Sequence, residues 1–271
     1  MARSCAICGK VSMGGFNPQS SGMNRVRAHR RCEPNLHPYR LTRGKTTERA
    51  LVDYAEAQKA QRRLVEWRRE GRVPDLLWLL EHPPTVTFGS SGGAHHLLCG
   101  PGDLGKRGIA YVRSERGGDI TFHEPGQLVG YPIVDWGGPG DRDLYVYLRR
   151  LEEGILSYLA SAGLACVRVP GKTGVWIEGA PPRKIAAIGV RAARWITSHG
   201  FALNVSNDLQ GFGWIVPCGI RDAGVTSMAR ELHEGLPPWG EICAGLQGAL
   251  EESLGRRLLL VRGPEGLTLT A

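Results

Sequence analysis

A cysteine in a turn is the side chain of this sequence best suited to covalent chemistry. Cys218 stands between Pro217 and Gly219, two residues that favour a turn. A turn leaves a thiol accessible, and beside a cation its thiolate becomes a usable nucleophile. Cys166 differs, because it falls within the strand-like run ACVRV. The sequence therefore offers Cys218 as a nucleophile, with an inert turn thiol as the alternative.

A lysine at the edge of an apolar run is the second candidate. Lys184 opens the run IAAIGV, within residues 181–205. A lysine taken out of water can act as a base, whereas an exposed one only adds solubility, and position alone favours solubility. Spacing along the chain does not tell whether Lys184 lies near Cys218. Four small residues of the same stretch leave room beside the backbone for a thin ligand, or equally for tightly packed strands. They are Ala187, Gly189, Gly200 and Ala202.

A glycine-rich segment, RGGDITFHEPGQ at 116–127, concentrates residues that a core does not need. Its adjacent glycines let a ligand approach the backbone, and Pro125 with Gly126 forces a second turn. A hairpin with solvated polar side chains is the alternative. Because an apolar strand follows at once, we expect a substrate-lining loop. Its histidine, taken alone, is more typical of a hydrogen-bonded structural residue than of a catalyst. The polar residues of the loop are Arg116, Asp119, Thr121 and His123.

Hydrophobic periodicity predicts the elements that must hold these segments. Helical spacing covers 54–67, 143–162 with a cap near Asp143, and 240–256. Apolar runs between turn residues predict strands at 76–80, 85–88, 109–112 and 128–134. The middle third adds short β-rich runs, too close together for helices between them: CVRVP, GVWI, KIAAIGV and WITSHGFALNV. Helices that bracket a group of strands predict an α+β fold, a mixed sheet with flanking helices on one face.

The net charge of +8 is concentrated at the start of the chain. Residues 1–48 hold nine Lys or Arg and two Asp or Glu, which leaves 25 basic and 24 acidic residues for 49–271. We therefore expect a basic N-terminal segment, 1–48, ahead of a main domain, 49–271. The nearly balanced charge of the main domain does not predict nucleic-acid binding by it.

Composition excludes several classes of protein. With 42% hydrophobic and 22% charged residues, the whole chain is neither disordered nor a coiled coil. No window approaches the roughly 18 consecutive apolar residues of a membrane span, so we expect no membrane partner. The first ten residues lack the apolar core of a signal peptide, which predicts a cytoplasmic protein. There the seven cysteines are expected to be buried, metal-bound or catalytic instead of disulfide-bonded.

Taken together, the three segments resemble the octanoyltransferases of lipoate biosynthesis, over about residues 50–260. The matching motifs are EHPPTVTFG at 81–89, RGGDITFH at 116–123, KIAAIGV at 184–190, HGFALNV at 199–205 and PCGI at 217–220. The resemblance implies a catalytic domain with the fold of biotin and lipoate protein ligases. It implies transfer of an octanoyl group from octanoyl-acyl carrier protein, through a cysteine thioester, to a lysine of lipoyl domains. These acceptors belong to 2-oxoacid dehydrogenases and the glycine cleavage H protein. No cofactor or metal enters that reaction.

The resemblance also implies roles for residues. Cys218 would carry the acyl thioester, and Lys184 would activate it and serve as acid and base. Glu124 departs from the family, whose members usually have glycine after the histidine, and leaves the conformation of that turn open. Substrate contacts are implied for three segments: Arg116, Gly117, Gly118, Asp119, Ile120, Thr121, Phe122 and His123; Ala187, Ile188 and Gly189; Gly200, Phe201 and Ala202.

The basic segment has a resemblance of its own, to the start of bacterial ribosomal protein L28, through MARSCAICGK and RRCEPNLHPYR. Cys5 and Cys8 have the spacing of zinc ligands, and Cys32 with His37 would complete a set of four. A single CxxC is a weak signal, so we do not expect a zinc site here. Two other functions stay open. One is an ATP-dependent lipoate or biotin ligase, against which the cysteine of PCGI argues. The other is an RNA- or ribosome-binding factor acting through its basic residues.

Overall fold

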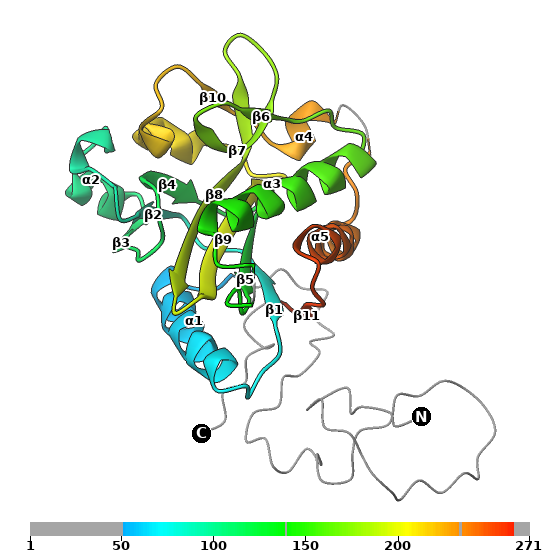
Figure 1. The fold of residues 1–271 in the computed structure, drawn as a ribbon. Coiled ribbons are helices and arrows are strands. Elements are labelled where there is room, and N and C mark those ends of the chain that lie inside the picture. Colours follow the sequence, from blue (N-terminus) through cyan, green and yellow to red (C-terminus); the bar gives the residue numbers. More distant parts are fainter. Residues whose placement is uncertain (1–50, 139, 233–234, 263–271) are drawn as a thin grey trace, which may run out of the picture. The chain divides into compact units, whose positions relative to one another are not determined.

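The computed structural model describes residues 51–138, 140–232 and 235–262 (Figure 1). These residues fall within one compact unit, Thr42–Leu267. The predicted boundary near residue 48 lies outside the described residues. So do the four candidate zinc ligands, Cys5, Cys8, Cys32 and His37.

A mixed eight-stranded sheet forms the centre of the fold (Figure 1). Its strands are β1 Leu76–Leu80, β5 Gln127–Ile133, β6 Val167–Val169, β7 Lys172–Ile177, β8 Arg183–Ala193, β9 Ile196–Asn204, β10 Gly224–Val225 and β11 Leu259–Arg262. They follow the order β11-β1-β5-β9-β8-β7-β6, with β10 paired to β8. The β1–β11 and β8–β10 pairs are parallel, and the others are antiparallel. The predicted α+β fold with a mixed sheet is confirmed.

A second, three-stranded sheet has the order β3-β2-β4 and a hydrophobic core of its own. Its strands are β2 Thr85–Phe88, β3 Ala110–Arg113 and β4 Ile120–His123. The prediction of a loop throughout 116–127 is wrong for β4, because Ile120 and Phe122 bury their side chains in this core. Between β2 and β3 the chain forms the short helix α2 Pro101–Lys106.

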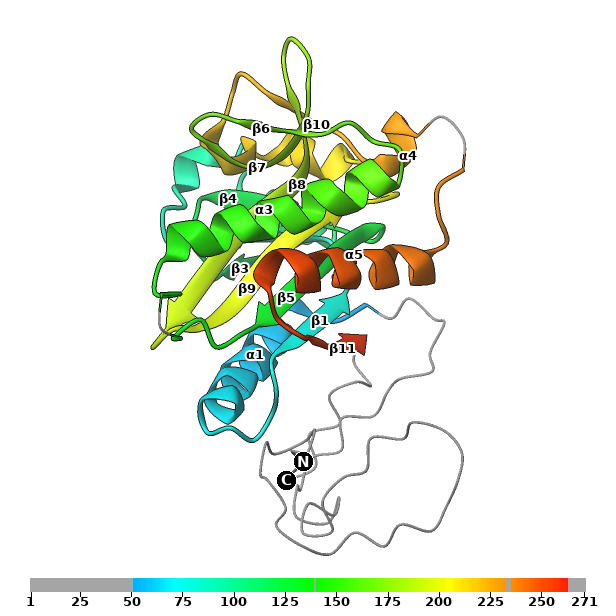
Figure 2. The same ribbon diagram turned by 45° about the vertical axis from the view of Figure 1, so that its right-hand side comes forward.

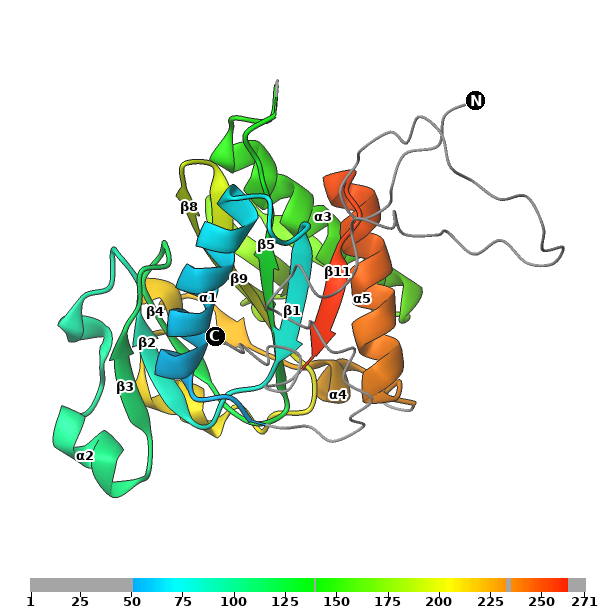
Figure 3. The same ribbon diagram turned by 90° about the horizontal axis from the view of Figure 1, so that it is seen from below.

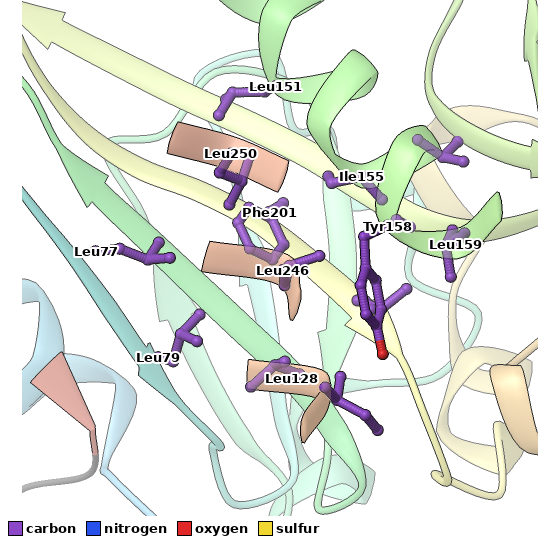
Figure 4. Packing of buried hydrophobic residues seen from close by; sticks show 14 of the residues in the cluster. Leu77, Leu79, Leu128, Leu151, Ile155, Tyr158, Leu159, Phe201, Leu246 and Leu250 are labelled. Atoms are coloured by element: carbon purple, nitrogen blue, oxygen red, sulfur yellow. The ribbon is translucent and has the colours of Figure 1, made fainter. Parts of the chain in front are cut away.

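Two long helices cover one face of the main sheet. α3 Leu144–Ser161 and α5 Trp239–Leu254 lie side by side across it (Figure 2). Figure 4 shows Phe201 of β9 next to Leu246 and Leu250 of α5. This packing forms the larger of the two cores described here. It leaves the opposite side of β8 and β9 for the site.

A third long helix, α1 Tyr54–Arg69, packs on the opposite side of the sheet, against β5 and β9 (Figure 3). The expectation of helices on one face is therefore wrong for α1. Its buried residues include Ala57, Leu64 and Val65, so its amphipathic surface needs a sheet to cover it. No helix among the described residues is long and apolar enough to cross a membrane.

The predicted helix ends agree with the structure to within two residues. Asp143 caps α3 as predicted, since its Oδ1 accepts hydrogen bonds from the N–H groups of Tyr145 at 2.7 Å and Val146 at 3.1 Å. α5 ends at Gly255, whose φ of 65° is left-handed. Shorter helical segments are α4 Met228–Glu231 and the 3-10 turns η3 Ala94–His96, η4 Gln210–Trp214 and η5 Pro217–Gly219.

Two helical glycines give a matched test of how closely α3 and α5 pack. A Cβ atom on Gly154 would lie 2.6 Å from Ser253 Oγ and 3.1 Å from Leu250 Cα, whereas one on Gly248 would meet nothing within 4 Å. Gly248→Ala should therefore raise the free energy of unfolding by roughly 0.5–1 kcal/mol. Gly154→Ala should lower it by about 1–3 kcal/mol, because the helices must separate. Urea denaturation measures both effects, and a stabilised Gly154→Ala would contradict the close packing.

Candidate active site

The turn η5 presents Cys218 in a strained conformation. Its φ of 56° is left-handed, which is uncommon for a residue with a side chain. Such a residue costs on the order of 1 kcal/mol or more and persists only where its surroundings hold it. Here the N–H of Gly219 donates to Val216 O and that of Ile220 donates to Pro217 O, both at 3.0 Å. The predicted turn is therefore present, with a half-buried thiol at its tip.

A histidine and an aspartate press against the same turn. His96 Nδ1 contacts Asp119 Oδ2 at ion-pair distance. A Cβ atom on Gly219 would lie 2.7 Å from His96 Cε1 and 2.8 Å from Asp119 Oδ2. Glycine is required at this position, since its φ is also left-handed, at 69°. The N–H of Val216 donates to His96 O at 2.8 Å, so the segment containing His96 holds both ends of the turn.

The decisive contact joins Cys218 to the lysine of β8. Lys184 Nζ donates a hydrogen bond to Cys218 Sγ at 3.1 Å, although 34 positions separate them in the chain. The lysine is only 6% exposed, and its Nζ lies 4.6 Å from the centre of the Trp176 ring. Among the described residues no carboxylate pairs with Lys184. A buried polar group is costly when it lacks a partner, so the hydrogen bond to Cys218 Sγ is a contact that satisfies the Lys184 side chain.

Behind this contact lies a cavity of about 580 Å³ between β8, β9, β4 and α1. Lys184 and Cys218 both line it. Most of the predicted substrate-binding residues line it as well: Arg116, Gly118, Asp119, Thr121, His123, Ala187, Ile188, Gly189, Gly200, Phe201 and Ala202. The small residues at 187, 189, 200 and 202 leave space along the two strands. Among the described residues, no group of three His, Cys, Asp or Glu is arranged to hold a metal ion.

Five of the residues expected to contact substrate do not turn a side chain into the cavity. Gly117 does not line the cavity, and its N–H donates to Val190 O at 2.8 Å. In β4, Thr121 and His123 face the cavity, whereas alternation turns the other two side chains into the second core. Two more residues border the cavity but pack their side chains on the helix side. The four residues whose side chains point away are Ile120, Phe122, Ile188 and Phe201.

Sequence reasoning missed several residues of the cavity wall, notably Tyr54, Tyr131 and His199. Tyr54 begins the amphipathic helix α1, and Tyr131 lies in an apolar strand, so neither carries a signal beyond ordinary core packing. Lys172, in β7, also lines the cavity, and its Nζ pairs with Asp222 at 2.8 Å. This ion pair connects two segments that border the site.

A chain of buried hydrogen bonds supports the cavity wall. Arg116 Nη2 donates to Thr87 Oγ1 at 3.0 Å, and that hydroxyl contacts His123 Nε2 at 3.3 Å. His123 Nδ1 contacts Gln127 Oε1 at 2.8 Å, and Gln127 Nε2 donates to Asn204 Oδ1 at 2.9 Å. Burial lowers the pKa of His123 well below its ordinary value. Both ring nitrogens of His123 therefore have hydrogen-bond partners, and the imidazole is neutral. This is the hydrogen-bonded structural histidine that the sequence analysis gave as the more typical case.

Glu124 has a structural role at the position where the family resemblance leads us to expect glycine. The side chain is buried, and its Oε1 accepts hydrogen bonds from Asn207 Nδ2 at 2.9 Å and from the N–H of Leu209 at 3.1 Å. Burial raises the pKa of this carboxyl, and the bond from Asn207 opposes that shift. The turn therefore keeps its left-handed Gly126, at a φ of 93°, while Glu124 fixes the segment after β9.

Comparison with known proteins adds a family to this geometry. Residues 53–241 match the model of the lipoyl protein ligase A/B catalytic domain. An octanoyltransferase of Chloroflexus aggregans is 48% identical over 200 residues, which are 73% of this chain and 89% of that protein. One from Rubrobacter xylanophilus is 50% identical over 205 residues, 74% of this chain and 90% of that protein. The chain belongs to the octanoyltransferases. As its relatives' name states, this is a family of acyltransferases.

Solved structures of lipoate protein ligases share the fold of this octanoyltransferase. A bipartite lipoate protein ligase from Thermoplasma acidophilum has a TM-score of 0.61 at 17% identity, covering 80% of this chain and 87% of that one. A lipoate-protein ligase A bound with ATP has a TM-score of 0.60 at 15% identity, covering 80% and 89%. The predicted likeness to lipoate protein ligases is confirmed for the fold.

Three buried histidines in and beside the cavity should make the octanoyltransferase sensitive to acid. Burial lowers the pKa of His82 to about 4 and that of His199 to about 3, and it lowers the pKa of His123 as described above. In the unfolded chain each histidine has a pKa of about 6.5, so unfolding takes up protons below that pH. Stability present above pH 6.5 should be lost as the pH falls toward 4, by up to about 1.4 kcal/mol per pH unit for each group.

Urea denaturation at pH 7 and pH 5 measures this loss. His82→Gln should reduce the dependence of the unfolding free energy on pH, because one of the neutral imidazoles is removed. His95→Gln is the matched control, since the His95 side chain is exposed. An equal reduction in both variants would contradict the assignment to buried histidines.

Proposed function

We propose that the octanoyltransferase carries its octanoyl group as a thioester on Cys218, with Lys184 as the proton donor and acceptor. The donor is octanoyl-acyl carrier protein, and the acceptor is the target lysine of a lipoyl domain. The observation that carries the proposal is the 3.1 Å contact between Lys184 Nζ and Cys218 Sγ. A thiolate suits both halves of the reaction, because it is a strong nucleophile and a good leaving group.

In the first half-reaction, the Cys218 thiolate attacks the carbonyl carbon of the donor thioester. The bond between that carbon and the carrier's sulfur breaks, and the departing thiolate takes a proton from the Lys184 ammonium. Cys218 then holds the acyl group and Lys184 is neutral. The short Nζ to Sγ distance supports this step, since the same ammonium can reach both sulfur atoms at the carbonyl.

In the second half-reaction, the neutral amine of the target lysine attacks the acyl carbon on Cys218. Lys184 accepts a proton from the attacking nitrogen, the carbon–sulfur bond breaks, and the thiolate and ammonium are restored. No proton is gained or lost over the cycle. Each tetrahedral intermediate needs N–H donors for its oxyanion, and we assign these to backbone groups of the glycine-rich segments that border the cavity.

The cavity supports an acyl chain as the group transferred. Ala187, Gly189, Gly200 and Ala202 border it with small side chains or none, and Val129 adds an apolar wall. Arg116, Gly118, Asp119, Thr121 and His123 would contact the substrate from the second sheet. We propose lipoyl domains of 2-oxoacid dehydrogenases and of the glycine cleavage H protein as acceptors. An ATP-dependent ligase is the competing function, but activating a free acid would give the Cys218–Lys184 pair no task.

Cys218→Ala should abolish both the acyl adduct and transfer. Incubation of the wild type with octanoyl-acyl carrier protein should add one octanoyl group to its intact mass, because the thioester accumulates without an acceptor. Cys166→Ala is the matched control and should acquire the adduct normally. An adduct that persists on Cys218→Ala, or transfer from free octanoate and ATP by the wild type, would refute the proposal.

Lys184→Met should slow the reaction of Cys218 with a thiol-alkylating reagent at pH 7 by roughly tenfold or more, because an unassisted thiol is mostly protonated there. The half-maximal rate should move to a higher pH, and acyl transfer should fall far more than stability. The shift belongs to the coupled pair and not to either residue alone. Lys59→Met, at an exposed lysine, is the control. An unchanged profile in a folded Lys184→Met would leave Lys184 without a role in activating the thiol.

A further inference from the structure

The side of the sheet on which Lys184 lies depends on one extra residue in β8. Strand side chains alternate between faces, so Lys184 and Ala186 should point the same way. Instead Lys184 and Ala187 line the cavity, while Ile185 and Ala186 both lie in the core beneath α3 and α5. The register with β7 shifts at this point, since Val175 pairs with Ala186 but Trp176 pairs with Lys184.

This shift is a β-bulge, and it decides where the lysine points. In an unbroken strand, Lys184 would share the face of Ala186 and Ile188, which pack on the helix side. A bulge inserts one residue and re-aims the side chains beyond it. The contact of Lys184 with Cys218 therefore requires the bulge, because regular pairing of β7 with β8 would turn the lysine to the other face.

Gly174 of β7 lies against the bulge in a conformation that needs glycine. Its φ is 122°, and a Cβ atom would lie 2.6 Å from Ala186 O and 3.4 Å from Lys184 Cε. The glycine thus touches both the distorted backbone and the stem of the lysine. Trp176, two residues on, contacts the ammonium end of the same side chain. Strand β7 forms the surface on which Lys184 rests.

The N–H of Gly174 donates a hydrogen bond to a helix side chain. The acceptor is Oε1 of Glu152, at 3.0 Å. This glutamate belongs to α3 and is wholly buried. Glu152 Oε2 accepts from Arg149 Nη1 at 2.5 Å and from Arg168 Nε at 3.1 Å. The two arginines compensate the buried charge, which leaves the other oxygen to hold the glycine.

We propose that Glu152 is a positioning residue for Lys184. By fixing the Gly174 amide, it keeps β7 in the shape that accommodates the bulge and aims the lysine at Cys218. Glu152 itself does not touch the reacting atoms. The inference rests on the proposed function only in taking Lys184 as the group that activates the thiol.

Two near-isosteric variants separate this role from a general contribution to folding. Glu152→Asp keeps the charge for Arg149 and Arg168 but withdraws the oxygen from Gly174. Glu152→Gln keeps an oxygen at that distance but removes the charge. Alkylation of Cys218 at pH 7 should slow on the order of tenfold in Glu152→Asp and stay near the wild-type rate in Glu152→Gln. Urea denaturation should show the greater loss of stability in Glu152→Gln, because the ion pairs are weakened.

The same variants in a Lys184→Met background complete the cycle. Glu152→Asp should have no further effect on alkylation there, since the group that it positions is absent. An equal slowing in both backgrounds, or a slowing in Glu152→Gln but not in Glu152→Asp, would overturn the positioning role. So would a wild-type rate in Glu152→Asp, provided that Lys184→Met alone slows alkylation. An unaffected Lys184→Met would instead refute the proposed function, and with it the reason to position the lysine.

Discussion

The contact between Lys184 and Cys218 is the constraint on which the rest of the site depends, because its two partners belong to different parts of the fold. Lys184 stands on β8 of the main sheet, over the core formed with α3 and α5. Cys218 stands on η5, which His96 and Asp119 hold from the side of the second sheet. Lys184 Nζ and Cys218 Sγ can stay 3.1 Å apart only if the two hydrophobic cores that support them are firmly joined.

Buried polar groups supply that junction. The hydrogen bonds from Thr87 and His123 to Gln127 and Asn204 run from the second sheet into β5 and β9 of the main sheet. Asn204 Nδ2 then donates to Thr226 O, and the N–H of Thr226 donates to Lys184 O at 3.0 Å. A satisfied network of this kind specifies one arrangement, because any slip would leave buried groups unpaired. The low pKa of its histidine follows from the same burial.

Local patterns in the sequence predicted the three long helices and most strands, and family motifs identified the candidate site. The alternation that turns Ile120 and Phe122 away from the cavity was hidden, because two glycines made the segment resemble a loop. The meeting of Lys184 with Cys218 depends on tertiary packing and on a bulge, and neither leaves a periodic signal. Glu152 was hidden for another reason: within DLYVYLRRLEEG it reads as one more charged residue of an amphipathic helix.

Several residues of the site lower the stability of the fold. Cys218 occupies a left-handed backbone, and Gly174 and Gly219 forgo side chains. Lys184 is buried, and no carboxylate in the part of the chain that the structure describes pairs with it. A carboxylate beside the lysine would relieve its desolvation, but it would also satisfy the ammonium and remove its preference for a thiolate. The reaction that we propose at Cys218 needs that preference, so its cost must be offset elsewhere. Helix α3, closely packed against α5, contacts β7 and β8 from the far side of the sheet. There Glu152 and its two arginines stabilise these strands without entering the cavity.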